Sequence, residues 1–404
     1  MNTEKIAAYI RSGAKSAENI GIEIEHFIVD KNNSSVSYYG ECGVGKILTE
    51  LSEAFDNRSY SEGQLIGLSN GRWHLTLEPA AQLEISIEPC EYIDEIESCY
   101  NDFLEMINPV LDKYGYRLLC IGYQPSDKVD ELDLIPKRRY ELMDRYFADT
   151  GIYGRNMMRG TASTQVSIDF TDEVDCIKKF RLANILVPLL ALITDNSPIF
   201  EGKPYNGRMI RTTIWNSVDN ARCGIVPGGA DVYFSFKKYA EYIMNVPPIF
   251  IERDGASVYT VSKRLKEIYD DHEMTESEIE HALSMVFPDV RLKQYIEIRP
   301  ADSMPINYAL SYAAFVKGIF NSLDAVYRYL NVDEITDSDV MYAKEELIAH
   351  GFNACVYNKR ASDIYEFLFM SALTSLSSRD RCYLSEIKEL IFSKQTPKEV
   401  LDII

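Results

Sequence analysis

Residues 21–29, with the sequence GIEIEHFIV, constrain the fold more than any other stretch of this chain. Successive side chains of a β-strand point to opposite faces, so the stretch predicts one apolar face and one face that carries Glu23 and Glu25. Residues 82–87, 163–170 and 295–299 repeat the pattern. Four such strands predict a sheet with one face packed on a core and the other face polar.

The polar faces of these segments are rich in carboxylates, and no lysine alternates with them. Their acidic and amide side chains, with one acid at the entry to the second strand, are Glu23, Glu25, Glu78, Glu84, Gln165 and Glu297. The polar face of any one of these strands, taken alone, is explained if it forms the solvent-facing side of an antiparallel sheet. Carboxylates gathered without water, however, need a compensating cation. Because Mg²⁺ and Mn²⁺ prefer oxygen ligands, the set predicts a divalent metal site if the strands converge.

The remainder of the chain alternates strand-like and helix-like segments. Apolar spacing predicts helices over residues 93–114 and 174–195, a further short strand around 208–215, and amphipathic helices from 306 to the end. No linker or repeat interrupts the pattern. We therefore expect an α+β fold in a single catalytic domain, 1–404, with the core motifs in 21–305 and a helical C-terminal part in 306–404.

Charge and composition exclude several classes of partner. The 404 residues include 42 Lys+Arg and 62 Asp+Glu, a net charge of −20, which argues against nucleic acid as a partner. The longest apolar run, 185–193, is too short to cross a bilayer, and the opening residues lack a secretory signal. The eight cysteines are scattered without a CxxC pair, which is typical of reduced thiols. These features predict a cytoplasmic protein with small-molecule partners.

Two other interpretations of the sequence, a phosphate-binding loop and a metalloprotease site, fit it less well than the metal site does. Residues 40–47, GECGVGKI, nearly match a phosphate-binding P-loop, but Ile47 stands where a Ser or Thr would hold Mg²⁺. A glycine-rich turn opening a helix explains the stretch better. No HExxH motif is present, which excludes a metalloprotease of that type. His26 falls on the apolar face of its strand and is predicted to be a structural histidine.

Six blocks, in order over residues 21–305, resemble the plant-type glutamate–cysteine ligases. They are GIEIEHF, LTLEPAAQLEIS, PKRRYELMDRYF, NMMRGTASTQVSIDF, NSPIFEGKPYNGRMIRTTIWNSVDNARCG and VFPDVRLKQYIEIRPADSMP. The resemblance implies a glutamine-synthetase-like catalytic fold, in which a curved antiparallel sheet forms an active-site funnel flanked by helices. It also implies ATP-dependent joining of the γ-carboxylate of L-glutamate to the amine of L-cysteine through a γ-glutamyl phosphate, with Mg²⁺ or possibly Mn²⁺.

The same resemblance implies roles for individual residues. The expected metal ligands are Glu23, Glu25, Glu78, Glu84 and Glu297. Arg211 and Arg299 are the expected catalytic residues, because a guanidinium suits carboxylate and phosphate oxygens and stabilises transferring charge. The expected substrate and ATP contacts are Arg139, Gln165, Trp215 and Arg222, with Trp215 on the same strand face as Arg211.

Departures from the family pattern leave the acceptor open. The carboxylates match the family, whereas residues 161–164 and 216–221 differ from it. A γ-glutamyl ligase that acts on another amine or amino acid is therefore an alternative. A nucleotide-binding module built on Lys46 and an inactive scaffold are more distant alternatives. We expect a monomer or a homodimer.

Overall fold

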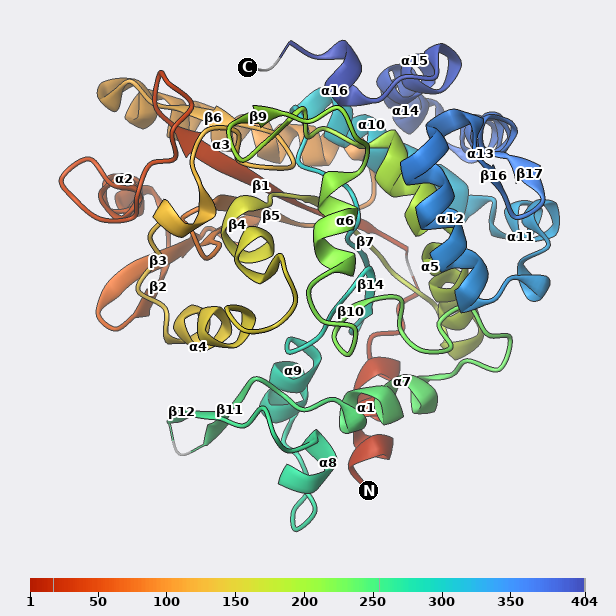
Figure 1. Ribbon diagram of the computed structural model, residues 1–404, viewed down its shortest axis with the longest axis horizontal. Coiled ribbons are helices and arrows are strands. Elements are labelled where there is room, and N and C mark those ends of the chain that lie inside the picture. The colour runs from red at the N-terminus through yellow and green to blue at the C-terminus, as the bar shows by residue number, and fades with distance from the viewer. Residues whose placement is uncertain (17, 254, 403–404) are drawn as a thin grey trace.

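The computed structural model describes residues 1–16, 18–253 and 255–402. Its central feature is a nine-stranded sheet in which β1 occupies a middle position and every neighbouring pair of strands is antiparallel (Figure 1). A short strand, β6 (Arg117–Leu119), also pairs with β1. The other strands, in spatial order, are β14 (Val290–Leu292), β15 (Ile296–Ile298), β7 (Thr164–Ile168), β1 (Ile20–Val29), β5 (Leu83–Cys90), β4 (Trp73–Leu77), β3 (Gln64–Ser69) and β2 (Asn57–Ser61).

The apolar face of the sheet is covered by helices. Ile22 and Ile24 of β1, Val166 of β7 and Ile298 of β15 are almost completely buried. Helices α3 (Ile93–Tyr114), α5 (Glu173–Ile193) and α10 (Ile306–Asn321) pack against strands of the sheet. The long helix α5 is buried along nearly its whole length, which explains why its sequence is apolar on all sides. The core lies between this sheet face and these helices.

The remaining elements surround this core. The other helices are α1 (Asn2–Arg11), α2 (Val44–Leu51), α4 (Arg138–Phe147), α6 (Ile210–Asn216), α7 (Phe236–Asn245), α8 (Leu265–Ile268), α9 (Glu276–Leu283), α11 (Leu323–Leu330), α12 (Asp337–His350), α13 (Ala361–Ser375), α14 (Ser378–Arg381), α15 (Ser385–Ser393) and α16 (Pro397–Val400). Small strand pairs are β8 (Ile199–Phe200) with β9 (Lys203–Pro204), β10 (Cys223–Gly224) with β13 (Phe287–Pro288), β11 (Phe250–Arg253) with β12 (Ala256–Tyr259), and β16 (Cys355–Val356) with β17 (Lys359–Arg360).

Most of the predicted elements are present, and one is of the wrong type. The strand expected around 208–215 is a helix, α6, whose first residue is Ile210. The helix begins here because the Asp195 carboxylate binds the backbone nitrogen of Met209, the residue that precedes α6. The glycine-rich stretch opens helix α2 at Gly43, as expected. Over the described ranges, no helix combines the length and apolar character needed to span a membrane.

His26 is a structural residue, as predicted. Its ring is fully buried, with Nδ1 3.1 Å from the carbonyl oxygen of Leu83 and Nε2 2.8 Å from the hydroxyl of Tyr100. Burial lowers the pKa of His26 to about 4, so the ring is neutral near pH 7. The histidine therefore ties β1 to β5 and α3 on the side of the sheet opposite the carboxylates.

Candidate active site

A cavity of about 270 Å³ opens on the polar face of the sheet. Strands β1, β5, β7 and β14 contribute residues to its floor, and helices α4 and α6 contribute to its walls. The predicted site residues that line it are Glu23, Glu25, Glu78, Glu84, Arg139, Gln165, Arg211, Trp215 and Arg299. The structure therefore gathers residues from distant parts of the chain into one polar pocket.

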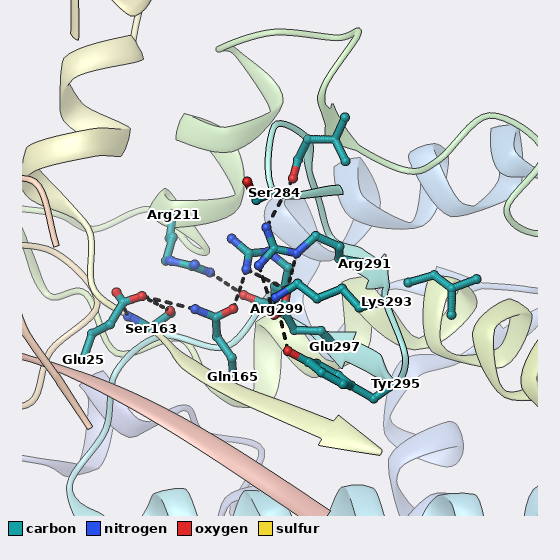
Figure 2. A network of polar contacts seen from close by, with 12 residues as sticks. Glu25, Ser163, Gln165, Arg211, Ser284, Arg291, Lys293, Tyr295, Glu297 and Arg299 are labelled. Atoms are coloured by element: carbon teal, nitrogen blue, oxygen red, sulfur yellow. Dashed lines mark hydrogen bonds and ion pairs between the residues drawn. The ribbon is translucent and has the colours of Figure 1, made fainter. Parts of the chain in front are cut away.

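Strand register brings the first carboxylates together. Glu25 on β1 pairs with Glu84 on β5, and Glu23 pairs with Gln165 on β7. Glu25 accepts hydrogen bonds from the backbone nitrogen of Ser163 at 2.7 Å, from its hydroxyl at 2.8 Å and from the Gln165 amide at 3.2 Å (Figure 2). These donors fix the orientation of one carboxylate at the edge where β1 and β7 meet.

Burial and mutual repulsion disfavour the charged forms of these carboxyl groups. Burial, followed by the charge of Glu78, raises the pKa of Glu25 to about 7, while Arg211 and Ser163 oppose the shift. Burial and the charges of Glu23, Glu78 and Glu25 raise the pKa of Glu84 well above its usual range. Among the described residues, Glu84 accepts hydrogen bonds from hydroxyl groups only, including one from Thr76 at 2.8 Å. In the absence of a bound cation, this side of the pocket therefore favours the protonated forms of its carboxyl groups.

Glu297, in contrast, is fully compensated by cations. Its buried carboxylate pairs with Arg291 through bonds of 2.7 and 3.0 Å, with Arg299 at 2.9 Å and with Lys293 at 3.2 Å (Figure 2). Burial alone would raise the pKa of Glu297, but these three cations hold it well below the usual range. Lys293 corrects the expectation that no lysine accompanies the carboxylates: it stands on the loop after β14, outside the strands that the sequence pattern defined.

The donor chemistry fits a divalent cation at part of the predicted ligand set. Among the described residues, no salt bridge is formed by Glu23, Glu25, Glu78 or Glu84, although the charges of Lys293, Arg291 and Arg299 act on Glu23. Carboxylate oxygens without an ion-pair partner suit Mg²⁺ or Mn²⁺. In the part of the chain that the structure describes, no three acidic, histidine or cysteine side chains converge as a ready ligand group. Mg²⁺ commonly takes one or two carboxylates and completes its shell with water and substrate phosphates. The arrangement fits that mode, whereas the cation-bound oxygens of Glu297 do not.

Helix α6 presents Arg211 and Trp215 to the pocket one turn apart, so they share a helical face rather than the strand face that was expected. The Arg211 guanidinium lies 5.7 Å from the centre of the Trp215 ring, and its Nη1 donates to the carbonyl of Arg299 at 2.9 Å. Within the described residues, Arg211 Nε and Trp215 Nε1 are buried without a hydrogen-bond partner. Unpaired buried donors are costly, so both are suited to an anionic ligand.

The other two predicted arginines differ in their surroundings. Arg139, on α4, lines the pocket and donates to the hydroxyl and carbonyl oxygens of Ser284 at 3.0 and 2.8 Å. Arg222 lies outside the lining and is engaged by Asp219, by the carbonyl of Pro247 and by the Tyr146 hydroxyl at 2.8 Å. Its guanidinium therefore binds groups outside the pocket, and its contact with substrate stays a prediction.

Sequence reasoning missed several lining residues. Arg291 and Lys293 share the cation cluster with Arg299, and their alternation across the β14–β15 hairpin was a usable signal, since Arg291 pairs with Glu297. The apolar wall was harder to foresee, because its members come from separate elements. It consists of Pro79, Met143, Met157, Met158 and Phe287.

One buried amide supports part of this wall. Met157 and Met158 belong to a π-helical turn, Asn156–Gly160. The Gln82 side-chain nitrogen lies 3.4, 3.2 and 3.2 Å from the carbonyl oxygens of Met158, Arg159 and Thr161. The turn leaves carbonyl groups without regular helical partners, and Gln82 supplies a donor to them. The apolar wall is thus linked to the acidic floor through Gln82, which directly precedes β5, the strand that carries Glu84.

Comparison with known proteins gives consistent results. The pattern of Glutamate-cysteine ligase family 2 matches residues 19–366. Glutamate–cysteine ligase B of Oryza sativa subsp. japonica, a chloroplastic protein, is 30% identical over 99% of this chain and 83% of its own length. The chloroplastic enzyme of Nicotiana tabacum is also 30% identical, over 99% of this chain and 79% of its own.

A solved structure gives the same result for the fold. The crystal structure of glutamate–cysteine ligase from Francisella tularensis in complex with AMP superposes with a TM-score of 0.58. The alignment covers 95% of this chain and 84% of that protein, at 12% sequence identity. At this identity the match concerns the fold alone, and it supports the α+β architecture with a curved antiparallel sheet that was expected from the sequence.

Proposed function

Since the chain belongs to glutamate–cysteine ligase family 2, we propose that the polar pocket on its sheet is the active site of an ATP-dependent ligase. The activity is the joining of the γ-carboxylate of L-glutamate to the amine of L-cysteine. The relatives that match nearly the whole chain carry the glutamate–cysteine ligase name, which favours cysteine over another acceptor. The observation that carries the site assignment is the opposition of uncompensated carboxylates and clustered cations across one cavity.

The reaction needs activation of a poor electrophile. The γ-carboxylate of glutamate attacks the γ-phosphorus of ATP, so that ADP leaves and a γ-glutamyl phosphate forms. The neutral amine of cysteine then adds to the acyl carbon, and the tetrahedral intermediate expels phosphate while the nitrogen loses a proton. Both steps develop charge on oxygens, which positioned guanidinium groups stabilise.

We assign Arg211 and Arg299 to those oxygens. Arg211 has an unpaired buried Nε and lies next to Arg299, whose carbonyl accepts from it at 2.9 Å. Arg299 is held by Glu297 and by the Gln165 amide oxygen at 2.5 Å, which orients the guanidinium before substrate binds. Arg139 and Trp215 contribute further donors to glutamate or ATP, and Gln165 orients both Arg299 and Glu25.

A divalent cation is part of the proposal. Glu23, Glu25, Glu78 and Glu84 would hold Mg²⁺, which when bound neutralises the phosphates of ATP. Glu297 is assigned instead to the arginines, as the counter-charge that keeps them in place. A single catalytic domain, a cytoplasmic location and a monomeric or homodimeric state remain predictions from the sequence.

The direct test is ADP release from purified protein supplied with MgATP and glutamate, with and without cysteine. We expect release to depend on cysteine and γ-glutamylcysteine to accumulate. Glu84→Gln should lower the rate at least 100-fold, whereas Glu88→Gln, an exposed position on the same strand, should retain it. Cysteine-independent release, or release with another amine only, would contradict the assigned acceptor, and no release would contradict the enzyme.

A further inference from the structure

The last short helix of the chain contacts the segment that leads into α6. In Figure 1, α16 lies at the upper edge beside the C-terminus, and α6 descends from the β9 region toward the middle of the sheet. Lys398 of α16 places its ammonium 2.8 Å from Oδ2 of Asp195, and it also donates to the carbonyl of Gly207. The Lys398 side chain is 9% exposed and that of Asp195 is fully buried. This ion pair is therefore shielded from water.

Asp195 transmits this contact to the start of α6. The same Oδ2 accepts a hydrogen bond from the backbone nitrogen of Met209 at 2.9 Å. Met209 directly precedes α6 and has φ 53° and ψ 47°, a left-handed conformation that residues with a side chain rarely adopt. Its carbonyl then accepts from the nitrogen of Thr213 in the first turn. The entry to the helix is held in an unfavourable conformation by a single carboxylate, two residues before Arg211.

Charge links the same group to Arg211. Asp302 accepts from the backbone of Asn196 at 2.9 Å and from the hydroxyl of Ser197 at 2.7 Å, so it is anchored beside Asp195. Burial raises the pKa of Asp302 to about 7, and the charge of Asp195 adds to the shift. Asp302 is also the foremost acidic neighbour of the Arg211 guanidinium. Lys398, Asp195, Asp302 and Arg211 are thus buried groups whose charges act on one another, and Lys398 and Asp195 form the direct ion pair among them.

We propose that Lys398 is a positioning residue for the active-site helix: its ammonium holds Asp195 against Met209 and thereby sets the orientation of Arg211 in the pocket. The proposal rests on the assignment of Arg211 to glutamate and the transferring phosphoryl group. Lys398 touches no pocket-lining residue in its own hydrogen bonds, so its effect passes through Asp195. Loss of the ammonium leaves a buried carboxylate without its counter-charge, which disrupts the contact with Met209.

The test combines kinetics with a local optical signal. The chain has two tryptophans, Trp73 in the core and Trp215 on α6, so Trp73→Phe leaves Trp215 as the only tryptophan, whose emission can be excited selectively over that of tyrosine. In that background, Lys398→Met is compared with Lys388→Met, an exposed lysine of the same C-terminal part. We expect Lys398→Met to raise KM for glutamate about tenfold and to shift the Trp215 emission, with KM for cysteine little changed. The Lys388→Met variant should match its parent.

Further variants distinguish a specific effect of Lys398 on α6 from a general contribution to the stability of the fold. Lys398→Arg, which keeps the charge, should recover part of the glutamate KM and of the emission. If Lys398→Met is poorly folded, Lys398→Gln supplies the same readouts with an amide donor in place. An unchanged KM and emission in a folded Met or Gln variant would overturn the proposal, as would an equal rise in both KM values. Trp215 emission reports on α6 even if the unaltered protein releases no ADP. Failure of the Lys398 proposal can therefore be distinguished from failure of the proposed ligase function.

Discussion

Glu25 on β1 and Glu84 on β5 are directly opposed in an antiparallel strand pair, and both side chains are at least nine-tenths buried. Like charges at opposed positions destabilise a sheet, and burial increases the effect. Glu25 and Glu84 accept hydrogen bonds from hydroxyl and amide groups, whereas the arginine salt bridge is made by Glu297. Without a bound cation, repulsion between these two carboxylates therefore lowers the stability of the folded protein, and this effect can be measured.

The first consequence is an unusual pH dependence of stability. The pKa of Glu25 is raised from 4.5 to about 7, so between these values the folded state binds more protons than the unfolded state. Stability is therefore highest below the unfolded pKa and falls as pH rises through the folded one, by about 3 kcal/mol at most for one such group. Urea unfolding in EDTA at pH 5 and pH 8 measures the change. Glu25→Gln should reduce the slope, and a slope of opposite sign would contradict this view of the pair.

The second prediction concerns the counter-charge at the cation cluster. Glu297→Gln leaves Arg291, Lys293 and Arg299 without their shared carboxylate, and we expect the free energy of unfolding to fall by about 3 kcal/mol. Glu53→Gln, at an exposed position, serves as the control in the same urea titration. Unaltered stability combined with weakened Mg²⁺ binding would instead make Glu297 a metal ligand.

Two buried arginines should respond differently to the same substitution. Arg211→Lys removes the planar fork from the pocket, and we expect kcat/KM for glutamate to fall about 100-fold with little change in unfolding. Arg222→Lys breaks the contacts with Asp219 and Pro247, so stability should fall by about 2 kcal/mol while kcat/KM of the folded enzyme is kept. Steady-state kinetics and urea unfolding on both variants provide the comparison. A loss of kcat/KM in Arg222→Lys without a loss of stability would instead indicate that Arg222 contacts the substrate.

The glycine-rich stretch before α2 gives a negative prediction. Lys46 is exposed and does not line the pocket. Lys46→Ala should therefore leave KM for ATP within about twofold of the unaltered value, since a surface lysine contributes little. Initial rates at varied MgATP concentrations give this KM. A large rise would indicate that residues 40–47 do bind the phosphates of ATP.

Strand alternation explains how much of the site could be predicted from the sequence. A period of two places Glu23 and Glu25 on one face whatever surrounds them, and the same holds for Gln165 and for Glu297 with Arg299. The register that sets Glu25 against Glu84 is a property of the assembled sheet, and no local pattern reveals it. The polar face could be predicted, therefore, but the partners of each carboxylate could not.

The sequence could not predict the features that tertiary packing decides. The segment 208–215 contains β-branched and aromatic residues that favour a strand, yet Asp195 holds Met209 in the conformation that begins α6. Arg222 resembles a substrate ligand in the sequence, and only the fold shows that the Tyr146 hydroxyl and the Pro247 carbonyl lie within its reach. Local propensity could not indicate either contact, because both partners are fixed by the folded structure.

The central place of β1 also bears on how the protein folds. This strand pairs with β5, β6 and β7, which come from separate later parts of the chain, so its contacts close long loops. Such non-local pairing is slow to form. Glu23 and Glu25 are brought against Glu84 and Gln165 only when these loops have closed, so the repulsion among the carboxylates arises late. A growing or partly folded chain is thereby spared that repulsion, and the polar pocket is complete only when the sheet is complete.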